Sequence, residues 1–220
     1  MAKDDRNENE QTEEEELFPE EFPPQILSPL SRKARLWGIF PAVLVLFAAW
    51  VISYIDWNQI TPDYYSLSLN SILHDHEYWR ILSSLFVHAN IQHFASNLLL
   101  LAVIGWYLFE YYGFILFPVA SLVCGMAANL TAVYFYGGDI HLVGASGMVY
   151  SMAALWLILY IRFDTGQRIG MRIFRASAFS LAMLFPTTFS PEISYIAHAA
   201  GFVYGIITAM ILGFFIKVKE

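Results

Sequence analysis

The chain has 220 residues, of which 57% are hydrophobic, 17% are aromatic and only 14% are charged, and its formal net charge is −7. This composition excludes an ordinary soluble globular domain and indicates a membrane protein, and the helix-length apolar runs described below predict that it is an all-α membrane protein. The negative charge belongs to one end, because residues 1–30 carry ten acidic side chains against Lys3 and Arg6, which leaves the remaining residues at about +1.

The acidic segment, residues 1–36, has no periodic apolar stripe and contains closely spaced prolines. Such a segment cannot bury enough apolar surface to offset the entropy lost when it becomes ordered. We therefore predict a disordered cytoplasmic tail over residues 1–36. The segment also lacks the basic start and short apolar core of a cleaved signal, so the first hydrophobic run is expected to stay as an anchor.

Six apolar runs follow, each near the length of about 20 residues that a helix needs to cross a bilayer. They cover residues 37–55, 83–109, 113–136, 144–161, 173–189 and 193–216. We predict one six-span domain, 37–216, and a short tail, 217–220. Arginines and lysines precede the first span, separate the fourth from the fifth and follow the sixth. Since basic loops stay in the cytoplasm, we expect a multi-pass protein of the cell membrane with both termini cytoplasmic.

Polar side chains that lipid would exclude occur at one depth of this bundle. His93, Ser146 and His198 each lie 17 to 19 residues, roughly 25–29 Å of helix, from the cytoplasmic end of their spans. An unpaired buried polar group costs about 2–7 kcal/mol, so groups that converge are expected to satisfy one another around a site. Each also has a purely structural alternative, as a hydroxyl or imidazole hydrogen-bonded within the bundle.

Local spacing adds further residues to this site. His93 and Asn97 are four residues apart on one face of span two, which also carries His88, and Ser146 and Tyr150 share a face of span four. The N–H groups at the start of a helix have no intrahelical partner. The free N–H groups at the start of span four, together with the side chains of His93 and Asn97, are suited to bind the oxyanion of an acyl-transfer reaction.

Glycines flank both the serine of span four and the histidine of span six: Gly144, Gly147, Gly201 and Gly205. Small residues let two helix backbones approach closely. Such an approach would bring His198 within hydrogen-bond reach of Ser146, which is the geometry that a base needs to activate a hydroxyl nucleophile. The alternative is a packing seam of small residues that only happens to include a histidine.

These residues resemble the motifs of the rhomboid family of intramembrane serine proteases. GASG at 144–147 resembles the nucleophile motif GxSG, AHAAG at 197–201 the motif AHxxG, and HANIQHFASN at 88–97 the motif HxxxxHxxxN. Trp79 and Arg80 resemble the signature of the long first outer loop, and Tyr150 takes the place of the aromatic residue that packs on the catalytic ring.

The resemblance implies a six-transmembrane-helix rhomboid-like bundle with a catalytic dyad of Ser146 and His198 and no acidic third member. It implies an oxyanion site built from the Ser146 amide and the side chains of His93 and Asn97. The expected activity is hydrolysis of transmembrane protein substrates in the lipid bilayer, near its outer face. We expect no metal or other cofactor and no nucleic-acid partner.

Three other classes of protein are less favoured. A metal or haem protein would use some of the six histidines, two of which form HDH at 74–76, but HExxH is absent and Cys124 stands alone. A catalytically inactive relative that binds membrane proteins would keep the fold and lose the reactive residues. A transporter would need polar groups along a whole path, whereas the inner halves of these spans are apolar.

Overall fold

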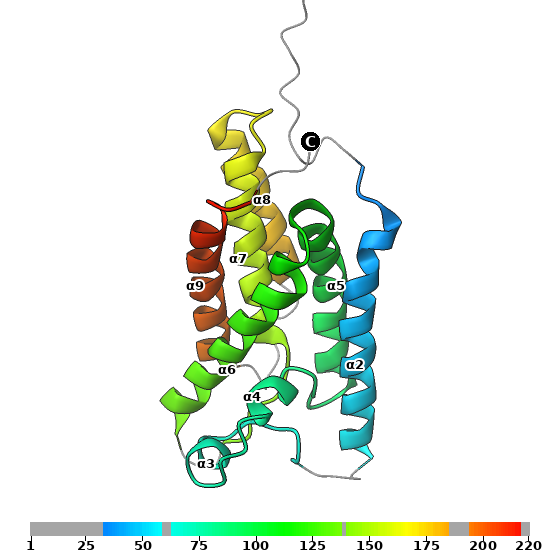
Figure 1. Cartoon of the computed structure of the whole chain (residues 1–220), viewed down its shortest axis with the longest axis vertical. Coiled ribbons are helices and arrows are strands. Elements are labelled where there is room, and N and C mark those ends of the chain that lie inside the picture. Colours follow the sequence, from blue (N-terminus) through cyan, green and yellow to red (C-terminus); the bar gives the residue numbers. More distant parts are fainter. Residues whose placement is uncertain (1–32, 59–62, 138–139, 185–193, 217–220) are drawn as a thin grey trace, which may run out of the picture.

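The computed structural model describes residues 33–58, 63–137, 140–184 and 194–216, which form an up-and-down bundle of long helices (Figure 1). The six long helices of this described part are α2 (Phe40–Trp57), α5 (Ile91–Tyr107), α6 (Ser121–Tyr136), α7 (Ser146–Phe163), α8 (Ile169–Leu184) and α9 (Tyr195–Leu212). The short elements are η2 (Leu36–Ile39), α3 (Leu69–Leu73), α4 (Arg80–Ser83), η3 (Leu108–Tyr112) and η4 (Ile115–Ala120).

Five helical segments are long and apolar enough to cross a membrane: Leu36–Trp57, Ile91–Tyr112, Ile115–Tyr136, Ser146–Phe163 and Tyr195–Leu212. The sixth helix, α8, has 16 described residues. The predicted all-α membrane bundle is therefore confirmed. The predicted tails at 1–36 and 217–220 lie outside the described residues, except for residues 33–36, and so does the end of the predicted fifth span, 185–189.

The prediction of a helical second span from residue 83 was wrong, because α5 begins only at Ile91. Asn90 caps it, with its side chain accepting a hydrogen bond from the His93 N–H at 2.8 Å. The apolar residues before Asn90 instead bond to other elements, since Ser53 and Trp57 of α2 donate to the carbonyl groups of Phe86 and His88. His88 therefore lies in the segment between α4 and α5 and not on the helix.

Local sequence signals explain the ends of the other helices. Pro41 lies in the first turn of α2, where a missing N–H costs nothing. Ser194 caps α9 by accepting from the Ala197 N–H at 3.2 Å. The extended backbone of Phe117, which precedes Pro118, interrupts the helical segment before α6.

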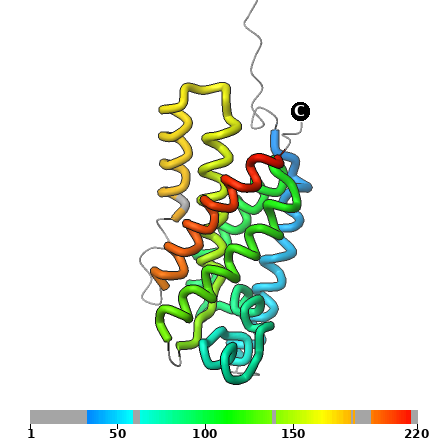
Figure 2. Tube along the Cα trace, turned by 60° about the vertical axis from the view of Figure 1, so that its left-hand side comes forward, coloured from blue at the N-terminus to red at the C-terminus, as the bar shows by residue number. Residues whose placement is uncertain are grey.

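Helix α7 is the centre of the molecule, and most of its side chains are buried. Its apolar residues Met148, Met152 and Leu155 pack in one core with Leu101 and Ile104 of α5. Helices α6 and α9 also pack closely against α7, whereas α8 contacts chiefly α7 and lies at the edge of the bundle (Figure 2). This arrangement buries the start of α7 and leaves α8 open to lipid.

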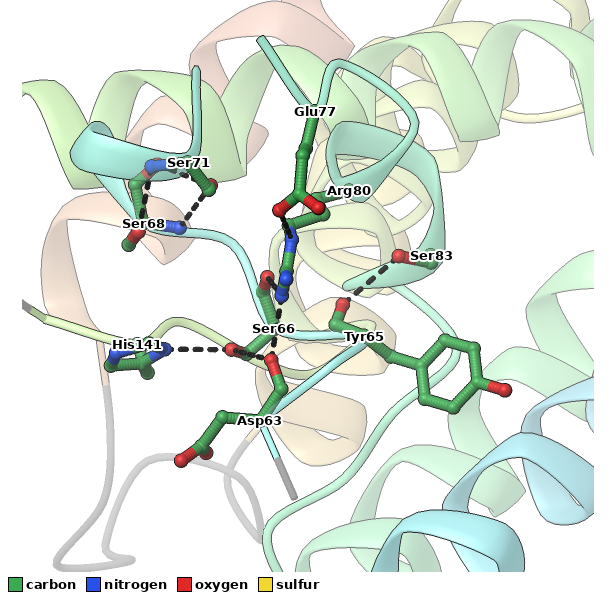
Figure 3. A network of polar contacts seen from close by, with 9 residues as sticks. All are labelled: Asp63, Tyr65, Ser66, Ser68, Ser71, Glu77, Arg80, Ser83 and His141. Carbon is green, nitrogen blue, oxygen red and sulfur yellow. Dashed lines mark hydrogen bonds and ion pairs between the residues drawn. The ribbon is translucent and has the colours of Figure 1, made fainter. Parts of the chain in front are cut away.

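The described part of the first loop, residues 63–90, folds around Arg80 at the end of the bundle that holds α3 and α4 (Figures 1 and 3). The Arg80 guanidinium donates to the carbonyl oxygens of Asp63, at 2.6 Å, and Ser66, at 3.1 Å, and pairs with Glu77. It also lies over the ring of Trp79, 5.0 Å from its centroid. A single arginine thus holds several turns of the loop together.

The first loop is also bonded to the segment that leads into α7. Leu67 and Leu142 exchange two backbone hydrogen bonds, of 2.9 and 2.7 Å, in an antiparallel bridge. Next to it, the Ser66 hydroxyl and Nδ1 of His141 are hydrogen-bonded at 2.8 Å (Figure 3). The backbone just before Ser146 is therefore fixed by a loop about 75 residues earlier in the chain.

Candidate active site

Ser146 is the first residue of α7 and is 9% exposed. The Val149 N–H donates to the Ala145 carbonyl at 2.9 Å, and the N–H groups of Ser146, Gly147 and Met148 precede this first bond of the helix. These N–H groups have no acceptor within the helix, and they lie at the N-terminus, the positive end of the helix dipole. The structure therefore confirms the predicted place of the serine at a helix start.

The glycines of α7 and α9 bring these two helices into backbone contact. A Cβ atom on Gly201 would overlap the Gly147 carbonyl oxygen, and one on Gly205 would overlap the carbonyl oxygen of Ser151. In the same contact, a Cβ atom on Gly147 would lie 3.2 Å from the Ala197 carbonyl oxygen. Since Gly147 follows Ser146 and Ala197 precedes His198, the serine and the histidine lie at the same level of the α7–α9 interface.

His198 is 6% exposed and packs against α7. Its ring is stacked on the ring of Tyr150, with centroids 4.0 Å apart and an angle of 16° between the planes. Tyr150 lies one helical turn after Ser146, so the stack holds the imidazole beside the serine end of α7. This is the contact that the resemblance implied for Tyr150.

His93 lies on the other side of the serine segment. A Cβ atom on Gly144 would be 2.7 Å from Cε1 and 2.9 Å from Nε2 of the His93 ring. The ring therefore leaves no room for a side chain at residue 144. Gly144 also has φ of +115°, a conformation that side chains disfavour. The structure thus brings Ser146, His198 and His93 together.

Asn97 is buried, one turn after His93 on α5. Its side-chain nitrogen donates to the His93 carbonyl oxygen at 3.1 Å, which uses one of its two hydrogens. Within the described residues its oxygen, Oδ1, has no hydrogen-bond partner. The predicted face shared by His93 and Asn97 is confirmed, and the part of Asn97 in an oxyanion site stays a prediction.

His88 packs against His93 of this site. It does not lie on the helix where sequence reasoning placed it. Its ring meets the rings of His93 and Phe94 edge-on, with centroid distances of 5.3 and 5.2 Å. Its Nδ1 is 3.3 Å from the Ser53 hydroxyl. His88 therefore links α2 to His93 and lies in a second layer of side chains.

Two buried polar residues near Ser146 were missed by the sequence analysis, Ser84 and Asn129. Asn129 could have been found, because it is a polar residue within the apolar run of the third span. The other polar residues of the site were found from the same signal. Ser84 gave no signal, because it lies next to a loop. Among the described residues, no group of three or more His, Cys, Asp or Glu side chains could hold a metal ion.

Comparisons with known proteins show which family this chain resembles. Residues 75–214 match the family model described as the Rhomboid domain. The chain is 28% identical to RHOMBOID-like protein 2 of Arabidopsis thaliana over 154 residues, which cover 70% of this chain and 47% of that protein. It is 25% identical to RHOMBOID-like protein 1 of the same plant over 154 residues, which cover 70% of this chain and 38% of that protein.

The family model covers more than half of the chain, and the chain belongs to the rhomboid family, a family of intramembrane proteases. It is a multi-pass membrane protein. The chain spans less than half the length of the two curated relatives named above.

Proposed function

We propose that this protein is an intramembrane serine endopeptidase that cleaves transmembrane protein substrates near the outer face of the cell membrane. The observation that carries the proposal is the backbone contact between α7 and α9, which sets Ser146 and His198 at one level of a buried interface. A base beside a hydroxyl is the arrangement that activates a serine nucleophile.

The proposed reaction proceeds in two steps. His198 accepts the hydroxyl proton as the Ser146 oxygen bonds to the substrate carbonyl carbon, and it then gives this proton to the leaving amine as the C–N bond breaks. Water attacks the resulting ester by the same route and releases the acid. The negative oxygen formed at each attack is bound by the amides at the start of α7 and by the side chains of His93 and Asn97.

The position of Ser146 supports a cut near the outer face. Ser146 lies at the end of α7 that faces α3, α4 and the first loop, about 26 Å of helix from Phe163 at the opposite end. Apart from Arg80, the described basic residues lie at that opposite end, before α2 or around the connection of α7 to α8, which supports cytoplasmic termini and an outward-facing first loop. A substrate helix must unwind to expose its carbonyl, so small or helix-breaking residues near the cut are expected to favour cleavage.

The test is labelling of the purified full chain in lipid vesicles with a fluorophosphonate, which reacts with activated serines. We expect labelling of the natural chain, loss of labelling in Ser146→Ala, and cleavage of a single-span substrate in its outer third, mapped by mass spectrometry. If this chain only binds membrane proteins and does not cleave them, it will bind the substrate but will not be labelled. That result, or equal labelling of the Ser146→Ala variant, would overturn the proposal.

A further inference from the structure

Asn129 of α6 is 1% exposed and lies against the turn that leads into Ser146. Its side-chain nitrogen has two hydrogens and two acceptors, the Ser84 hydroxyl at 3.2 Å and the Gly144 carbonyl at 3.4 Å. The Gly144 N–H in turn donates to the Ser84 carbonyl at 2.8 Å. Both polar backbone groups of Gly144 are therefore held by Asn129 and Ser84.

The same amide also reaches the residue that follows the serine. Its oxygen lies 3.4 Å from the place that a Cβ atom on Gly147 would occupy. Asn129 thus bonds to the backbone before Ser146 and lies next to Gly147 after it, while the His93 ring lies against Gly144. The turn carrying Ser146 and the N–H groups at the start of α7 is enclosed between α5 and α6.

A buried amide in a membrane bundle has an ordinary structural explanation, since it often bonds two helices and only stabilises the fold. Asn129 differs in what it binds, because its contacts are with the turn that fixes the direction of the serine. Loss of its nitrogen would leave the buried Gly144 carbonyl without this partner, and such a group moves or costs free energy. Displacement of a reacting group by about 1 Å can slow a reaction roughly 100-fold.

We infer that Asn129, supported by Ser84, is a positioning residue that holds Ser146 and the adjoining amides in the reactive arrangement. It acts through the backbone of Gly144 and does not touch the substrate. The inference rests on the proposed serine protease function. It predicts a change in the rate constant at which Ser146 reacts, and no change in the fraction of folded molecules.

The experiment compares Asn129→Leu, of similar side-chain volume but without hydrogen-bonding groups, with Ser121→Ala. Ser121 is a matched control, because it is also a buried polar residue of α6, about two helical turns before Asn129, and its hydroxyl donates to the Leu116 carbonyl at 2.8 Å. The readouts are the rate constant and the end point of fluorophosphonate labelling, the melting temperature, and kcat and KM for a single-span substrate.

For Asn129→Leu we expect roughly a 10- to 100-fold fall in kcat and in the labelling rate constant, with KM and the final labelled fraction unchanged. Ser121→Ala should keep the natural rate constant and kcat, even where its melting temperature falls. Ser84→Ala, which removes one acceptor of the Asn129 amide, should slow labelling in the same direction and by less.

A natural rate constant in Asn129→Leu, with fewer serines labelled at the end point, would overturn the inference and leave only a role in folding. Should this variant not fold, Ser84→Ala decides, and an unchanged kcat in that variant overturns the inference. A natural chain that neither labels nor cleaves would instead contradict the proposed protease function.

Discussion

Helix α7 meets α9 and α8 through two different kinds of interface. Towards α9 it presents small residues, and Gly147 of α7 and Gly201 of α9 place the two backbones in direct contact. Towards α8 it presents large side chains, such as Trp156, whose ring centroid is 6.1 Å from that of Phe179. Backbone contact leaves little freedom, whereas interlocked side chains can rotate and part.

The other side of α8 is not covered by the described residues, since Phe174 and Leu181 are 68% and 71% exposed. Helix α8 is therefore held mainly by its contacts with α7. At the end near Phe163, Arg172 donates to the Ile161 carbonyl at 2.7 Å and fastens α8 to α7. The proposed reactive pair lies on the interface made by backbone contact, and we predict that a substrate helix enters through the side-chain interface between α7 and α8. The following predictions test this division.

Removal of either proposed reactive group should have the largest effect. Ser146→Ala and His198→Ala are each expected to lower cleavage by roughly 1,000-fold or more, because the two groups act as one unit. The melting temperatures should stay close to that of the natural chain. Cleavage of a single-span substrate in vesicles is the measurement, and substantial turnover by His198→Ala would refute the dyad.

Asn97→Ala should slow cleavage about 100- to 1,000-fold, the usual cost of one oxyanion donor, and by less where other donors compensate. The loss should fall on kcat and leave KM nearly unchanged. Steady-state kinetics on the same substrate would check this. A change confined to KM would show that Asn97 binds the substrate and not the developing charge.

Gly201→Ala tests whether backbone contact at the α7–α9 interface is required. Its added methyl group would overlap the Gly147 carbonyl oxygen, so we expect a loss of about 1–3 kcal/mol in unfolding free energy and a clear loss of activity. Gly170→Ala is the matched control on α8, because a Cβ atom there has nothing within 4 Å. Equal unfolding free energies in the two variants would break the comparison.

Phe179→Ala tests the side-chain interface and should have a smaller effect. Loss of the ring that packs on Trp156 is expected to loosen α8 and to raise the cleavage rate several-fold, with a slightly lower melting temperature. Phe174→Ala removes the same ring from the exposed side of α8 and should leave the rate unchanged. A slower Phe179→Ala enzyme would argue that substrates enter elsewhere.

Deletion of residues 1–30 should have the smallest effect. The acidic segment precedes the first helix and is predicted on the opposite face of the membrane from Ser146, so turnover of a short substrate is expected to stay nearly unchanged. Turnover in vesicles of defined composition is the measurement. A large fall would indicate a regulatory role for the tail.

The sequence was informative where a residue was out of place in lipid. Ser146, His198 and His93 could be found because a polar group in an apolar span needs a reason, and counting along helices put them at one depth. The α7–α9 contact could be anticipated from the glycine spacing, since small residues at a helix interface have one common use.

Long-range bonds explain what could not be predicted. The apolar run before Asn90 has the composition of a helix, but its polar groups bond to distant parts of the chain, among them Ser53 and Trp57 of α2. Asn129 resembles any amide that joins two helices until its partners, Ser84 and Gly144, are known. Local pattern carries no information about a partner that is distant in the chain.

The order of the helices along the chain has a consequence for biosynthesis. His198 belongs to α9, the last described helix, whereas Ser146 and the first loop are synthesised earlier. Chains leave the ribosome from the N-terminus at about 5–20 residues per second, so Ser146 enters the membrane several seconds before its proposed partner. The nascent protein would therefore stay unreactive towards neighbouring membrane proteins until α9 has packed against α7.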